Sequence, residues 1–162
     1  LRYERAVQEE QPQNLRRQER NKQRRQQPQR LLLTWMVNCP KELFPQLEGK
    51  ITPTDFTEPE LKKLAEKLFD QYQETGTVTP ASIINQYEDL DGQEMVASIL
   101  QTTLELNPDP EDQSKVITEI VRKVKMESIQ YQMTHLKDIE KLQTLMKLKE
   151  EVPNWNISDI IG

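Results

Sequence analysis

The segment between residues 111 and 134 constrains the fold most, because its apolar residues form two stripes on opposite sides of one predicted helix. Successive helical residues are rotated by about 100°, so side chains three and four positions apart share a face. The first stripe contains Val116, Ile117, Ile120, Val121 and Val124, and the second contains Met126, Ile129, Met133 and Leu136. The apolar face changes at Lys125. A helix with two apolar faces needs two packing partners.

The two stripes predict two different neighbours for this helix. The first stripe can pack on the helices that precede it, whereas the second has only the segment that follows. That segment is also periodic, with Ile139, Leu142, Leu145, Met146 and Leu148. A short turn between the two predicts an antiparallel helical hairpin. We therefore expect an all-α fold, a bundle of about five or six helices followed by a projecting C-terminal helical hairpin.

The preceding sequence contains several signals for helices. Residues 31–37 are apolar on every side, which is typical of a helix surrounded by others. Thr57 and Glu60 have the spacing of a capping box, and Gly76 follows the periodic segment that they introduce. Asp91 is the expected cap of a later helix. After Pro153 an apolar tail remains, which either folds back on the hairpin or serves as a docking peptide.

Charge and composition divide the chain into three expected parts. Residues 1–29 form a basic, glutamine-rich linker, residues 30–125 the bundle, and residues 126–162 the hairpin and tail. The first 30 residues hold nine Lys and Arg against four Asp and Glu, and the rest holds 13 against 23. An acidic body repels phosphate, so direct contact with nucleic acid is expected only weakly, through the basic arm.

Few residues in this chain could carry chemistry. It has one His, one Cys and four Gly, and no glycine-rich loop. A single cysteine, Cys39, excludes an internal disulfide and a thiolate cage for zinc. Glu88, Asp89 and Asp91 form an acidic cluster between helices, where caps are the simpler explanation. His135 is explained as a cation at a helix C-terminus. We therefore expect no catalytic residue, metal site or cofactor, and no enzymatic activity in this fragment.

The chain also lacks the features of a membrane or secreted protein. No apolar run approaches the about 20 residues that a membrane span needs, and no secretory signal is present. We expect a cytoplasmic protein. The chain begins at Leu1 within an Arg- and Gln-rich stretch, which suggests a fragment of a longer protein.

The order of these parts resembles a known family, the C-terminal helicase-interaction domain of bacterial DNA primase. The resemblance runs from about residue 29 to residue 152 and depends on the sequences EPELKKLAEKLFDQYQETG, EIVRKVKMESI and DIEKLQTLMKLK. It implies a helical bundle with a hairpin that docks on the N-terminal domains of the hexameric replicative DNA helicase. In that family this contact belongs to the primosome and couples RNA primer synthesis to DNA replication in the bacterial cytoplasm. The zinc-ribbon and polymerase domains of a primase are not in this chain.

The resemblance also implies which hairpin positions bind the helicase. They are Ile129, Gln132, Met133, Leu136, Ile139, Leu142, Gln143, Met146 and Lys147. The apolar tail from Trp155 departs from the simple hairpin ending that the family leads us to expect, so the end of the contact surface stays open. A monomer is expected.

Three other interpretations remain open at this stage. The basic arm could make the chain a nucleic-acid-binding module, whose affinity would fall steeply with salt. The bundle also resembles the N-terminal domain of the replicative helicase, but there the domain opens the chain and a linker follows it. The hairpin could instead self-associate in an oligomerisation domain.

Overall fold

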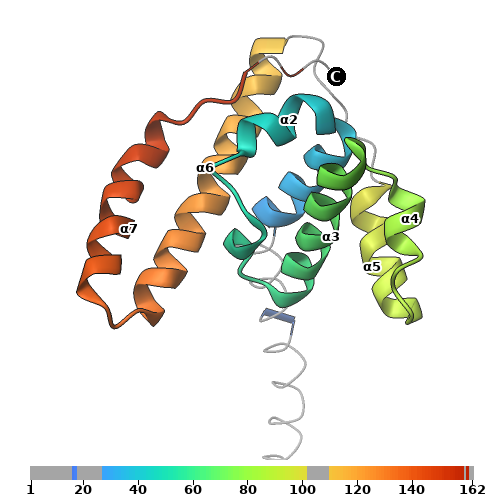
Figure 1. The fold of residues 1–162 in the computed structure, drawn as a ribbon, viewed down its shortest axis with the longest axis horizontal. Helices are drawn as coiled ribbons and strands as arrows, with labels where there is room; N and C mark the ends of the chain where they lie inside the picture. Colours follow the sequence, from blue (N-terminus) through green and yellow to red (C-terminus); the bar gives the residue numbers. More distant parts are fainter. Residues whose placement is uncertain (1–15, 18–26, 102–109, 159, 161–162) are drawn as a thin grey trace, which may run out of the picture.

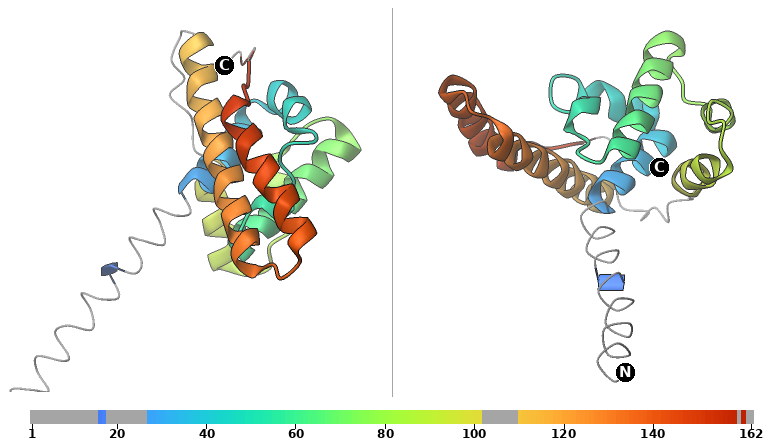
Figure 2. Two further views of the ribbon diagram at one scale, coloured as in Figure 1. Left: turned by 90° about the vertical axis from the view of Figure 1, so that its left-hand side faces the viewer. Right: turned by 90° about the horizontal axis from the view of Figure 1, so that it is seen from below.

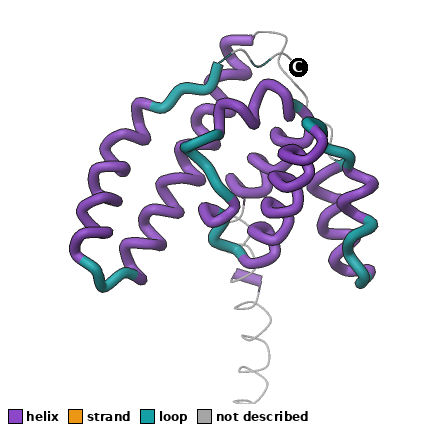
Figure 3. Tube along the Cα trace, viewed as in Figure 1, coloured by secondary structure: helices purple, strands orange, loops and turns teal. Residues whose placement is uncertain are grey.

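The structure is a computed structural model, and it describes residues 16–17, 27–101, 110–158 and 160. Within these residues every regular element is a helix, which confirms the predicted all-α fold (Figures 1 and 3). A first helix covers residues 27–38. It is followed by α2 (Pro40–Leu47), η1 (Pro53–Asp55), α3 (Pro59–Thr75), α4 (Pro80–Ile84), α5 (Leu90–Leu100), α6 (Pro110–His135), α7 (Ile139–Glu151) and η2 (Val152–Asn154).

The helix over residues 27–38 is central to the bundle, as its apolar circumference predicts. Residues 32–36 are all buried, and Leu32, Leu33 and Met36 are fully inaccessible. The buried hydroxyl of Thr34 donates to the carbonyl oxygen of Ile99 in α5 at 3.1 Å. Burial of the apolar side chains provides the main driving force for packing, and this bond gives the buried Thr34 hydroxyl a partner.

Local sequence signals set some helix ends, and Gly76 acts as predicted. Gly76 ends α3 in the left-handed conformation, with φ of 71°, and its N–H donates to the carbonyl oxygen of Tyr72 at 2.7 Å. Glycine adopts this backbone without the steric cost that a Cβ imposes. Pro80 is the first residue of α4, where a missing N–H costs nothing.

Two predicted caps are wrong, because other groups compete for the same positions. The N-cap of α3 is Glu58, one residue later than Thr57, and it makes no side-chain cap bond. The Thr57 hydroxyl instead accepts from Nε2 of the buried Gln29 at 2.8 Å. The cap of α5 is Asp89, whose carboxylate accepts from the N–H of Gly92, while Asp91 lies in the first turn.

Helix α6 has the two apolar faces that its sequence predicts. Ile117, Ile120, Val121 and Val124 are buried in the bundle core, and Ile129 is buried in a separate cluster with residues of α7. The prediction is wrong for one residue of the first stripe, because Val116 at its edge is 50% exposed. Figures 1 and 2 show the consequence, a hairpin of α7 and the second half of α6 that projects from the bundle.

The tail after α7 contacts the bundle as well as the hairpin, whereas the sequence predicted that it folds back on the hairpin or serves as a docking peptide. Ile157 and Ile160 are buried in the bundle core, and Trp155 contacts both cores. The main-chain N–H of Ile157 donates to the Thr118 hydroxyl at 2.9 Å. Gln46 in α2 exchanges two hydrogen bonds with the main chain of Ser158.

Several sequence predictions lie outside the described residues. They concern most of the basic linker, and residues 102–109 and 161–162. The expected division at residues 29 and 125 also stays a prediction. The structure adds that α6 runs without interruption across residue 125.

Candidate partner-binding surface

The hairpin is closed on its inner side by a small apolar cluster. Helices α6 and α7 are joined by a turn over residues 136–138, and the carboxylate of Asp138 caps α7 by accepting from the N–H of Glu140 at 3.0 Å. Ile129, Leu145 and Val152 are buried between the two helices. Met126, Met133, Leu136, Leu148 and Trp155 pack around them, partly exposed. This cluster holds the two helices together and fixes which face of α7 points outward.

The predicted binding positions on α6, together with Leu136 in the turn, mostly face this inner cluster. Ile129 is fully buried, and Met133 and Leu136 are half-buried against it. Gln132 faces the bundle side, where its Nε2 donates to the Ser128 hydroxyl at 3.0 Å. These four residues support the hairpin, and only the exposed parts of Gln132, Met133 and Leu136 reach its surface.

The predicted positions on α7 form the outer face of the hairpin. Ile139 is 71% exposed and Met146 is 52% exposed, and Gln143 and Lys147 are exposed beside them. Ile139, Gln143 and Met146 are spaced by four and three residues, so they share one side of α7. Leu142 is half-buried next to this side. Two large apolar side chains are thus exposed on one side of α7, as expected of a surface that binds a partner.

An aromatic and acidic surface on α6, next to the start of α3, was not predicted from the sequence. A hollow of about 420 Å³ lies between α6 and the start of α3, lined by Thr57, Glu58, Glu127, Gln130 and Tyr131. Tyr131 is half-exposed and stacks on His135, with ring centres 4.1 Å apart. Burial raises the pKa of the Glu127 carboxyl, against a lowering by Lys123. The four-residue spacing of Tyr131 and His135 was the available signal.

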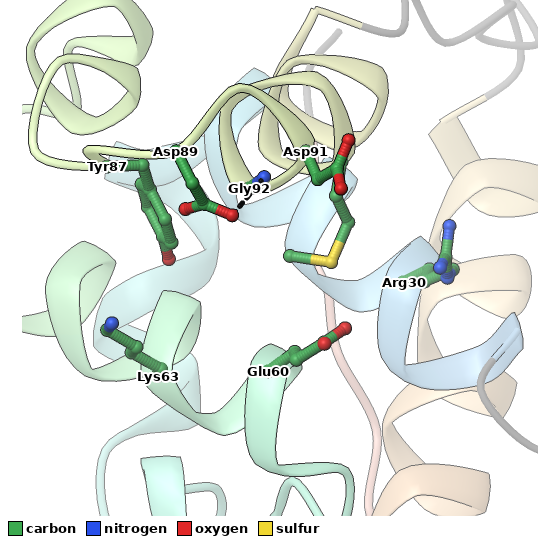
Figure 4. A pocket seen from close by; sticks show the side chains of 8 residues that line it. Arg30, Glu60, Lys63, Tyr87, Asp89, Asp91 and Gly92 are labelled. Atoms are coloured by element: carbon green, nitrogen blue, oxygen red, sulfur yellow. Dashed lines mark hydrogen bonds between the residues drawn. The ribbon is translucent and has the colours of Figure 1, made fainter.

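A second hollow, of about 380 Å³, lies between the first helix, α3 and α5 (Figure 4). Its charged side chains have both signs, with Arg30 and Lys63 facing Glu60, Asp89 and Asp91. Because two cations and three carboxylates are mixed in this lining, the hollow presents no surface of a single charge to a ligand. It is not the candidate site.

One buried side chain in this second hollow lacks a hydrogen bond. The Tyr87 ring is 8% exposed, and its hydroxyl has no partner among the described residues. Burial, and secondly the charge of Glu60, raise the pKa of Tyr87 to about 12. The ammonium groups of Lys63 and Lys67 lie 5.5 and 5.3 Å from the ring centre. Cation–π attraction therefore accounts for the position of the two lysines over the ring.

The remaining candidates for chemistry have structural explanations. Burial, reinforced by Glu42, raises the pKa of the Cys39 thiol, which disfavours the reactive thiolate. His135 ends α6, where its Nδ1 lies 2.7 Å from the carbonyl oxygen of Tyr131. No three His, Cys, Asp or Glu side chains in the described part of the chain are grouped to hold a metal ion. No described helix is long and apolar enough to cross a membrane.

Comparisons with known proteins add no relative. No protein family, curated protein or solved structure matches this chain.

Proposed function

We propose that this chain is the helicase-interaction domain of a DNA primase and that the outer face of α7 binds the hexameric replicative helicase. The observation that carries the proposal is the exposure of Ile139 and Met146 on a hairpin whose inner side is already closed. The resemblance of the sequence to that primase domain supplies the partner. The chain itself acts without chemistry, and primer synthesis belongs to other domains of the primase.

The geometry supports a positional mechanism. The hairpin projects from the bundle (Figure 2). A large partner could therefore reach the outer face of α7 without any movement of the bundle. Binding there would hold the attached polymerase near newly unwound template and raise its effective concentration. Apolar anchors in such an interface account for most of its affinity, with neighbouring polar residues excluding water.

The proposal is tested by calorimetric titration of the chain with the helicase of the same organism. We expect the substitutions Ile139→Glu and Met146→Glu to weaken binding by at least about tenfold each, because each places a charge in an apolar contact. Truncation after Leu136 is a poorer test, because it also removes Ile157 and Ile160 from the bundle core.

The chain offers a matched control for each variant. Leu90 is 68% exposed on α5, close to the 71% of Ile139, and Val116 is 50% exposed, close to the 52% of Met146. Leu90→Glu and Val116→Glu should leave the affinity unchanged. Equal affinity for all four variants would show that the outer face of α7 is not the contact. If the unchanged chain does not bind the helicase at all, the primase proposal is wrong.

A further inference from the structure

A buried carboxylate joins the hairpin to the bundle at the position where α6 changes its apolar face. Asp55 in η1 is 2% exposed. Its carboxylate accepts from Lys125 Nζ at 3.0 and 3.1 Å, and from the Ser128 hydroxyl at 2.7 Å. It also accepts from the main-chain N–H of Thr52 at 2.9 Å. We call the contact of Asp55 with Lys125 and Ser128 the Asp55 junction.

The Asp55 junction is formed by directional bonds, unlike the apolar contacts of α6 with the bundle core. Val121 and Val124 hold α6 by apolar packing, which is non-directional and tolerates small rotations of a helix. Hydrogen bonds to a carboxylate require defined distances and angles. A buried charge must also keep its partner, because separation leaves it desolvated and unpaired. The junction therefore favours one orientation of α6 over neighbouring ones.

The tail also makes polar bonds with α6. Arg122 Nε donates to the carbonyl oxygen of Trp155 at 2.8 Å, and the Thr118 hydroxyl accepts from the main-chain N–H of Ile157 at 2.9 Å. These bonds join α6 to the segment after α7, so they do not tie α6 directly to the bundle elements before it. Only the Asp55 junction joins α6 to η1 by side-chain bonds among the described residues. Figure 1 shows η1 beside the middle of α6.

We infer that Asp55 is a positioning residue that fixes the orientation in which the hairpin leaves the bundle. Its carboxylate has a double role, since the bond from Thr52 shapes η1 while Lys125 and Ser128 attach α6 to it. Without the junction, α6 would remain packed through its apolar residues but would rock against η1. The inference concerns the chain alone and does not depend on the identity of the partner.

The test measures the distance between the hairpin and the bundle in solution. Spin labels are attached at Lys141→Cys on α7 and Glu74→Cys on α3, both exposed positions, in a Cys39→Ala background. Double electron–electron resonance spectroscopy gives the distribution of distances between the labels. We expect one narrow distribution in the otherwise unchanged chain. The double variant Lys125→Met and Ser128→Ala should broaden and shift it, with the helix content by circular dichroism unchanged.

Two further variants make the result specific to Asp55. Lys123→Met removes an exposed lysine two residues before Lys125 and should leave the distribution narrow. Asp55→Asn retains an oxygen for the N–H of Thr52 but loses the ion pair, so it should broaden the distribution. If Asp55→Asn does not fold, the double variant decides, because it leaves the carboxylate and η1 intact. A broad distribution in the unchanged chain, or a narrow one in the double variant, would overturn the inference.

Discussion

The bundle and the hairpin are built from the same type of helix but are held together very differently. The bundle core combines buried side chains from the first helix, α2 to α6 and the tail. The apolar cluster of the hairpin contains only three buried side chains among the described residues, Ile129, Leu145 and Val152, with partly exposed residues around them. Two helices alone cannot bury all of their apolar surface, so the hairpin leaves Ile139 and Met146 in solvent. The comparison teaches that the region with the smaller buried core, which we expect to be the less stable one, is also the region proposed to bind a partner.

The largest expected effect concerns the bundle core. Leu64 in α3 is fully buried, and Leu64→Ala should lower the free energy of unfolding by about 2–5 kcal/mol, through lost burial and the cavity that remains. Urea unfolding followed by circular dichroism measures this. The exposed Leu90 is the control, since Leu90→Ala should change the free energy by less than about 0.5 kcal/mol. Similar losses for both would mean that the bundle is not the stable region.

A smaller and more local effect is expected in the hairpin. Ile129→Ala should cost about 2 kcal/mol, the lower end of the usual range, because a cluster this open can relax around the cavity. Hydrogen exchange locates the effect. The main-chain amides of α7 should exchange faster while those of α3 keep their rates. Equal acceleration in both helices would show that the hairpin and bundle unfold together, and the contrast drawn between them would fail.

The smallest effect concerns the polar group that the bundle buries without a partner. Tyr87→Phe should stabilise the protein by about 1 kcal/mol, because it removes a desolvated hydroxyl that makes no hydrogen bond among the described residues. The variant should also change the pH dependence. The pKa of Tyr87 is raised from 10.0 to about 12 in the folded protein. The folded state therefore holds this proton more tightly than the unfolded chain.

The sign of that pH effect follows from the raised pKa. The stability that the protonated phenol contributes is complete below pH 10 and is lost as the pH rises toward about 12. Between these values the unchanged chain should lose more stability than Tyr87→Phe. Unfolding of both proteins at several alkaline pH values measures the difference, and the shared titration of lysines cancels from it. A constant difference across this range would contradict the assignment.

Features that depend on local periodicity were predictable from the sequence. The change of face at Lys125 predicted both cores of α6, because helical geometry fixes which of its side chains point the same way. Gly76 marked a helix end for an equally local reason. The outer position of Ile139 and Met146 also follows from the spacing of α7 once its inner face is known.

Features that depend on distant partners were not predictable in this way. The Thr57 cap failed because Gln29, far away in the sequence, occupies its hydroxyl. The Asp55 junction spans 70 and 73 residues, and no local pattern distinguishes Asp55 from an ordinary turn aspartate. The return of the tail to the bundle was not predicted, because the partners of Ile157 and Ile160 lie in the bundle core, far away in the sequence. In each case tertiary contacts override the local preference.

Because the tail returns to the bundle, the hairpin lies in the sequence between two segments of the same core. The chain leaves the bundle core after Val124 and re-enters it at Ile157 and Ile160. A ribosome synthesises these two isoleucines after the whole hairpin, so the bundle cannot complete its core until the hairpin has been synthesised. The loosely packed hairpin is therefore synthesised before the last residues of the densely packed bundle core. Because both ends of the hairpin are anchored in the bundle, its length and outer face can change while the bundle remains the same.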